Sequence, residues 1–185
     1  MHLVLYPVLK IPKLNFWKTI ITKNKGSLPS FIMYSKEQSS KLKEAFWATF
    51  GQYIAPHPSA EGEKISWINY KTGIRHLHFK MQADHRSACI AIEINHPDPG
   101  IRELFFEQFV SFRNILKQYL NEDWDWELEL RDDNQKLVSR IYTSLDGVNI
   151  FRQEDWPALI SFFKPRIIAL DEFWNDARHS FDLFR

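Results

Sequence analysis

Three short segments in the middle of the chain alternate between apolar and polar residues, and this pattern limits the fold more than any other feature. The segments are residues 65–70, 76–81 and 89–95, and short turn-forming sequences separate them. Successive side chains of a strand point to opposite faces, so alternation predicts half-buried strands. Consecutive strands with short links run antiparallel. We therefore predict a three-stranded antiparallel meander with one face in the core and one face turned outward.

Helix patterns stand before and after this region. The sequence Ser35–Gln38 has the spacing of a capping box, and apolar residues follow it at helical intervals. A second helix is predicted from a cap at Asp98 to about Tyr119, because apolar residues again recur every three or four positions. A last helix should begin near Asp155, and Pro165 in its interior should kink or split it.

Two more strands are predicted between the second and the last helix. Alternation over 124–130 and 137–141 favours a hairpin, and pairing residue 130 with residue 137 places Glu127 opposite Arg140. The order α-β-β-β-α-β-β-α predicts a single α+β domain, with an antiparallel sheet packed by helices on one face. The inward phases of these elements predict a core that includes Trp67, Phe79, Ile92, Phe105, Phe109, Trp126 and Phe163.

Charge divides the chain into two parts. Residues 1–32 contain five lysines and no acidic residue, so all 23 acidic residues lie in residues 33–185. We expect 1–32 to be a basic extension outside the core, and Met33 to be a natural start for a single α+β domain over 33–185. Deleting 1–32 should then shift the melting temperature by no more than a few degrees.

Composition excludes several classes of protein. A formal net charge of +1 does not favour a strongly electropositive nucleic-acid binder, and no apolar run reaches the roughly 20 residues of a membrane span. The single cysteine, Cys89, excludes an internal disulfide and a multi-cysteine zinc site, and it suggests a reducing, cytoplasmic location. The sequence indicates no cofactor. Cys89 beside Lys80 could be a reactive thiol, although a strand cysteine more often acts as a small apolar residue.

The outward face of the meander carries the residues with catalytic potential. A tight turn between the second and third predicted strands pairs residue 78 with residue 93, so Glu93 should face His78, with His76 and Lys80 within diagonal reach. A His–Glu pair could act as a general base, and His76, His78 and Glu93 together could hold a divalent metal. We favour instead a solvated sheet face on which histidine and lysine balance Glu93, because no nucleophile or third ligand is evident. If the pair is partly buried, Glu93 should raise the pKa of His78.

Several short motifs resemble a known family. They are Phe46–Gly51, Ile92–Ile94, Leu104–Gln108, Trp124–Glu127, Ser139–Ile141, Trp156–Ile160 and Phe163–Pro165. From Met33 to the C-terminus the chain resembles the "domain of unknown function 4268" family of prokaryotic proteins. The resemblance implies no established activity. It also implies that longer relatives carry such a domain behind a restriction-nuclease-like domain, which suggests nucleic-acid-processing or defence systems.

A nuclease site can be tested on the chain itself. Helix, three strands, helix and strand is also the order of a restriction-endonuclease core, whose site needs an Asp and a Glu-x-Lys close enough to share magnesium. The sequence Glu93–Asn95 lacks the lysine. Asp84, the nearest upstream aspartate, is expected at the hairpin tip beside Ser87, and Glu93 lies six residues beyond Ser87, ~20 Å away at ~3.3 Å per residue. A degenerate nuclease-like fold without an active site therefore remains an alternative.

Three functional classes follow from the sequence, and whether the chain is an enzyme stays open. The leading hypothesis is a binding or interaction module, either homo-oligomeric or docked to a nucleic-acid-processing protein, with Trp47 as a candidate interface residue because it lies off the main helical stripe. The second is a small hydrolase or metal enzyme that uses His76, His78 and Glu93. The third is direct nucleic-acid binding through the lysines of 1–32.

Overall fold

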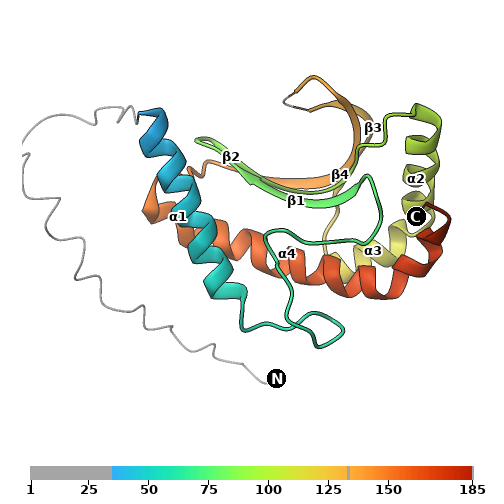
Figure 1. Cartoon of the computed structure of the whole chain (residues 1–185), viewed down its shortest axis with the longest axis horizontal. Helices are drawn as coiled ribbons and strands as arrows, with labels where there is room; N and C mark the ends of the chain where they lie inside the picture. Colours follow the sequence, from blue (N-terminus) through green and yellow to red (C-terminus); the bar gives the residue numbers. More distant parts are fainter. Residues whose placement is uncertain (1–34, 133, 185) are drawn as a thin grey trace, which may run out of the picture. The chain divides into compact units, whose positions relative to one another are not determined.

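Helices and a four-stranded sheet make up the described part of the computed structural model, which covers residues 35–132 and 134–184. In chain order the elements are α1 (Lys36–Ile54), β1 (Leu77–Ala83), β2 (Ser87–Ile94), α2 (Pro99–Ser111), α3 (Arg113–Leu120), β3 (Asp125–Arg131), β4 (Leu137–Asp146), the 3-10 turn η1 (Gln153–Asp155), α4 (Trp156–Ala177) and the 3-10 segment η2 (Arg178–Phe184) (Figure 1). The sheet is antiparallel, with strand order β1-β2-β4-β3. The α+β class and the succession of helical and strand regions are confirmed. The prediction for residues 1–32 lies outside the described residues.

The first predicted strand, residues 65–70, is wrong, because this segment is a loop. Its neighbourhood is held by side chains instead of a strand ladder: the Trp67 indole N–H donates to the His57 carbonyl at 3.1 Å, and the Trp174 indole N–H donates to the Thr72 carbonyl at 2.9 Å. Within the described residues, only β1 and β2 therefore lie between α1 and α2. The strand order that suggested a degenerate nuclease-like fold is absent there.

The same loop is fastened to α4 by a buried carboxylate. Asp171 accepts hydrogen bonds from the Ala60 N–H at 2.6 Å and from the Tyr70 hydroxyl at 2.7 Å. Burial, followed by the bond to Asp171, raises the pKa of Tyr70 well above its usual value. A long loop thus gains fixed geometry from α4.

The helix starts follow the predicted caps. Ser35 and Gln38 form the reciprocal capping box of α1, and the Asp98 side chain accepts the Ile101 N–H at the start of α2. The prediction of one continuous second helix is wrong, because it is interrupted at Phe112 into α2 and α3. Pro165 was expected to kink or split the last helix, and it does not split α4.

The register of the sheet agrees with the predicted turn. His78 pairs with Glu93, as the hairpin geometry required, and Glu127 lies opposite Arg140. Leu130, however, pairs with Val138 and not with residue 137, because the register shifts between Glu127 and Leu130. The irregularity preserves the predicted cross-strand charge pair.

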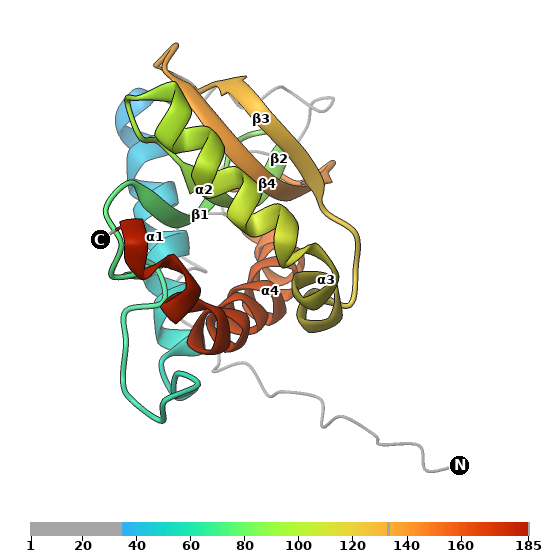
Figure 2. The same cartoon turned by 90° about the vertical axis from the view of Figure 1, so that its right-hand side faces the viewer.

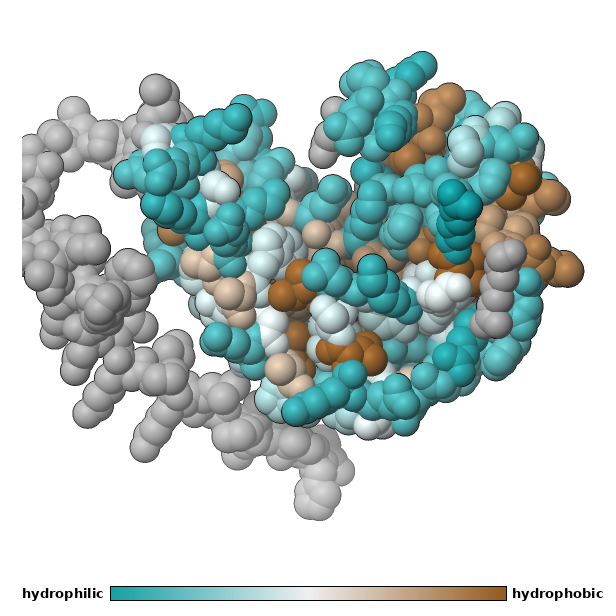
Figure 3. Space-filling model, in the orientation of Figure 1, coloured by the Kyte–Doolittle hydropathy of each residue, from teal (hydrophilic) through white to brown (hydrophobic). Residues whose placement is uncertain are grey.

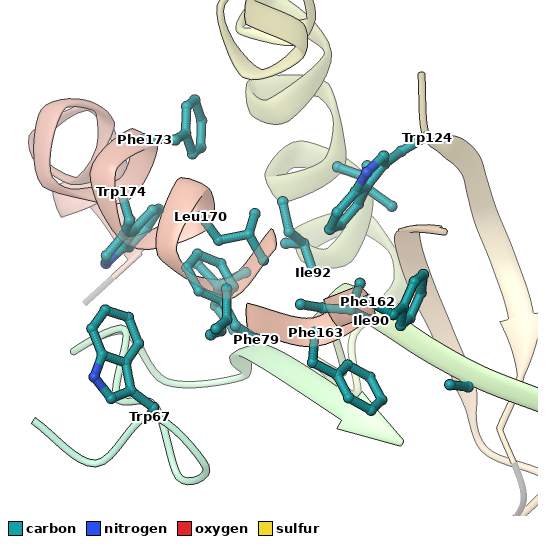
Figure 4. Close-up of a cluster of buried hydrophobic side chains, with 14 of the residues drawn as sticks. Trp67, Phe79, Ile90, Ile92, Trp124, Phe162, Phe163, Leu170, Phe173 and Trp174 are labelled. Carbon is teal, nitrogen blue, oxygen red and sulfur yellow. The ribbon is translucent and has the colours of Figure 1, made fainter. Parts of the chain in front are cut away.

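One hydrophobic cluster joins α1, α2 and α4 to the inward face of β1 and β2. The close-up in Figure 4 shows part of it, with Phe79 of β1 near Trp174 of α4 at a ring-centroid distance of 5.7 Å. Six of the seven predicted core residues are buried, whereas Trp126 is only partly buried. Trp126 instead packs beneath the Arg113 guanidinium, 5.1 Å from the ring centroid. Among the described residues, no helix is both long and apolar enough to cross a membrane.

Candidate functional site

The outward side of the sheet forms a charged ladder across all four strands. His78, Glu93, Arg140 and Glu127 are successive cross-strand partners from β1 through β2 and β4 to β3. Lys80, Ala91, Tyr142 and Asp125 form the next row in the same way. We call this surface the charged face, defined by His78, Lys80, Glu93, Glu127, Arg140 and Tyr142.

Glu93 is the buried centre of the charged face. Its side chain is 1% exposed, and its carboxylate accepts from the Arg140 guanidinium at 2.9 Å (Nε) and 2.7 Å (Nη2), and from the Lys80 ammonium. The expectation of a solvated Glu93 is therefore wrong. Lys80 and Arg140 cover the carboxylate and balance its charge, because a buried ion is tolerated only with such partners.

His78 is the cross-strand neighbour of Glu93, as predicted, but its titration is opposite to the prediction. Its pKa is lowered, chiefly because burial penalises the charged imidazolium and next because Lys80 repels it. Glu93 acts in the other direction but does not prevail, since its carboxylate is engaged by Lys80 and Arg140. A neutral imidazole here can accept a proton, yet the carboxylate that would assist it is already bound.

His76 lies apart from the charged face. It precedes β1 with a left-handed backbone (φ 65°), its Nδ1 is 3.2 Å from the Asn95 Oδ1, and its ring meets the His96 ring edge-to-face at 4.8 Å. Within residues 35–132 and 134–184, no group of three His, Cys, Asp or Glu side chains is arranged to hold a metal ion. The structure thus brings Lys80 to Glu93, whereas His76 contacts Asn95 and His96 and acts on His78 only through its charge.

The charged face is hollowed by the bend of the β3–β4 hairpin. Figure 1 shows this hairpin curving away from α4, and Figure 3 shows a notch above the sheet with hydrophilic atoms on both sides. At the hairpin turn, the Lys136 N–H donates to Asp132 at 2.8 Å and is the main group that lowers the pKa of Asp132; the Lys80 charge adds to this effect.

Two further groups on this side, Tyr142 and Cys89, stay protonated near neutral pH. The Tyr142 hydroxyl donates to Glu127 at 2.6 Å, and this bond raises the pKa of Tyr142 to about 12. Burial raises the pKa of Cys89 to about 11, so its thiol stays protonated near neutral pH. The second finding favours the small apolar role for Cys89 over the reactive one.

A groove lies between α2, η2 and the loops around His76 and His96. This groove has a volume of about 780 Å³ and is lined by Arg75, His76, His96, Ile101, Leu104, Phe105, Glu107, Gln108, Leu183 and Phe184. Leu104 is 55% exposed and Leu183 is 94% exposed. Phe105 stacks on Phe184 with ring centroids 3.9 Å apart, which joins α2 to η2. Figure 2 looks toward α2 and the C-terminal segment, and Figure 3 shows hydrophobic surface at that end of the molecule.

Sequence reasoning missed this groove. Ile101 is one of the apolar residues that recur along the predicted second helix, and that pattern places it on the buried stripe, but it is exposed at the groove rim. Leu104 could have indicated an exposed apolar surface on this helix. It is an apolar residue one position away from the buried series Phe105 and Phe109, so the core does not need it. Leu104 becomes part of a groove only because η2, which lies far along the chain, lines the same hollow.

Trp47, the candidate interface residue, lies on α1 and is partly buried. Its ring packs edge-to-face on Phe46 and Phe50 at 5.0 and 6.0 Å, and contacts Phe163 of α4 at 5.4 Å. Its main contacts are therefore within this chain.

Comparison with known proteins identifies a family. The model of a family described as a domain of unknown function (DUF4268) matches residues 42–178. No protein of the curated set and no solved structure matches the chain.

Proposed function

Because the chain belongs to the DUF4268 family, a domain of unknown function whose description specifies no activity, we propose a function from its own side chains: it is an interaction module that binds a partner segment in the groove between α2 and η2. The exposed apolar rim of that groove carries the proposal. Ile101, Leu104 and Leu183 present large hydrophobic side chains to solvent around a concave surface. Burying them against a partner would release about 25 cal/mol per Å² of apolar surface.

The contrast with the charged face supports this choice. A general base or metal ligand must have a free electron pair near its substrate, but both oxygens of Glu93 accept hydrogen bonds from cations. The thiol of Cys89 and the phenol of Tyr142 are both held protonated. These groups explain a rigid sheet better than they explain catalysis, and a groove with an apolar rim is typical of recognition.

The expected partner follows the family resemblance as part of this proposal. A nucleic-acid-processing or defence protein is the class that the resemblance suggests, and a second copy of the chain is the other occupant considered. In both cases the cytoplasm would be the place of contact.

The test is a peptide selection on the full chain. Random peptides displayed on phage are selected for binding, and each recovered peptide is measured against Leu104→Asp and against Val110→Asp by isothermal calorimetry. Val110 is a matched control, because it is an exposed apolar residue of α2 that does not line the groove. The proposal expects peptides that lose at least about tenfold affinity with Leu104→Asp only, equal to about 1.4 kcal/mol. Peptides that bind both variants like the native chain would refute it.

A further inference from the structure

The groove carries a pair of opposite charges that the fold itself does not use. Arg75 and Glu107 both line it and both are exposed. Neither forms an ion pair with another residue in the described part of the chain. Charged side chains beside an apolar surface usually select a partner and orient it, more than they add affinity.

The two charges lie toward different ends of α2. His96 is close to the first turn of α2, since its ring accepts the Asp98 N–H and Asp98 caps the helix. His76 packs against His96, and Arg75 is its chain neighbour. Glu107 lies six residues beyond Ile101, about 9 Å along the helix at ~1.5 Å per residue. The basic side chains therefore gather at one end of the groove and the carboxylate lies further along.

Groove-lining residues of α2 have helical spacing. Ile101, Leu104 and Gln108 follow one another at intervals of three and four along α2, which defines a strip parallel to the helix axis. A second helix laid beside α2 can place side chains at i, i+3 and i+7 into such a strip. Leu183 and Phe184 of η2 also line the groove, and Phe184 stacks on Phe105 of α2.

We propose that the groove binds an amphipathic helix of a partner protein that carries an acidic side chain toward Arg75, His76 and His96, apolar anchors over Ile101 and Leu104, and a basic side chain toward Glu107. This inference rests on the proposed function and adds the chemistry of the partner. The acid-free residues 1–32 of this chain do not meet the requirement, because they offer lysines but no carboxylate.

The experiment uses synthetic probes and the full chain. The parent probe is a 14-residue helical peptide with leucines at i, i+3 and i+7, one glutamate at one end and one lysine at the other. Companion probes replace the glutamate, the lysine or both by glutamine. Fluorescence anisotropy gives the Kd of each probe for the native chain and for Arg75→Gln, Glu107→Gln and the control Arg86→Gln. Arg86 is an exposed arginine in the β1–β2 turn, at the other end of β1 from His76.

Specific couplings are expected. Replacing the probe glutamate should weaken binding to the native chain by up to about fivefold, the range of an exposed ion pair, and should have no effect on binding to Arg75→Gln. The probe lysine should couple to Glu107 in the same way, and neither charge should couple to Arg86. In 0.5 M salt, which screens exposed charges, the effect of each probe charge on the Kd should become smaller.

Other results would overturn the inference and separate it from the proposed function. Equal binding of all four probes, with sensitivity to Leu104→Asp, would refute the charge requirement and leave the groove as a docking surface. Lack of binding by every probe would refute the helical occupant. Whether the groove is a docking surface would then be decided by the affinity of the selected peptides for Leu104→Asp. A dimer in analytical ultracentrifugation that Leu104→Asp dissociates would identify a second copy as the occupant and overturn the partner helix.

Discussion

Replacing Glu93 by glutamine tests whether the charged face contributes to stability as a buried ion network. Glutamine keeps the size of the side chain but removes the charge that Arg140 and Lys80 balance. Arg140 is 14% exposed and makes two contacts with the carboxylate, at 2.7 and 2.9 Å. A hydrogen bond to a charged group contributes about 1.5–3 kcal/mol. The Lys80 side chain is 36% exposed, so solvent screening limits its share to at most about 1 kcal/mol.

The expected loss for Glu93→Gln is therefore about 2–4 kcal/mol in the free energy of unfolding. At 2–4 °C per kcal/mol for a domain of this size, the melting temperature should fall by roughly 5–15 °C. Urea unfolding followed by tryptophan fluorescence measures the first quantity, and calorimetry measures the second. Circular dichroism should show that the variant keeps its helix and strand content.

Double-mutant cycles show which cation, Arg140 or Lys80, contributes more of the stabilising interaction with Glu93. Arg140→Met and Lys80→Met are combined with Glu93→Gln, and the interaction energy with Arg140 should exceed that with Lys80 by about 1 kcal/mol or more. A loss below about 1 kcal/mol for Glu93→Gln would contradict the reasoning. So would a coupling to Lys80 as large as the coupling to Arg140, because burial would then not decide the strength.

Three further predictions follow from burial. Ile92→Ala should lower the free energy of unfolding by ~2–5 kcal/mol in urea, because Ile92 is fully buried. Leu137→Ala, at an exposed position, should lower it by less than about 1 kcal/mol, and similar losses for the two variants would contradict the packing argument. Because the pKa of His78 is lowered, the folded chain binds a proton at His78 less readily than the unfolded chain does. The resulting contribution to stability is complete above the unfolded-state pKa of about 6.5, and it is lost as the pH falls through the lower folded-state pKa. Between pH 7.5 and 5 the native chain should therefore lose more stability than His78→Gln, and an equal loss would show that His78 is not the group concerned. With its pKa raised to about 11, Cys89 should react with iodoacetamide at pH 8 at least about tenfold more slowly in the folded chain than in urea, and equal rates would show an open thiol.

Local sequence signals decided where most elements begin. The Ser35–Gln38 box and the Asp98 cap fixed two helix starts, because a cap satisfies backbone groups only a few residues away. The β1–β2 turn likewise determined that His78 faces Glu93, since alternation and a short link leave one register that buries the apolar side chains. These features depend on neighbours in sequence, so the sequence was sufficient for them.

Alternation misled the prediction where tertiary contacts replaced strand pairing. Residues 65–70 alternate like a strand, yet the segment is a loop and Tyr70 bonds to Asp171, 101 residues further along the chain. β1 is an edge strand of the described sheet, so a sheet edge was available for a third strand, but residues 65–70 do not pair with it. The fixed contacts to α4 provide an alternative set of hydrogen bonds.

Tertiary structure alone decided the environment of the candidate sites. Glu93 is buried against Arg140, 47 residues away, and the pKa of His78 is lowered chiefly by burial of its ring and next by the Lys80 charge. The groove likewise needs Arg75 and His76 before β1, α2, and Leu183 and Phe184 near the C-terminus to converge. Sequence periodicity reports which face of an element is apolar, but exposure and pKa depend on which distant side chains cover that face, and only the packed chain brings those side chains together.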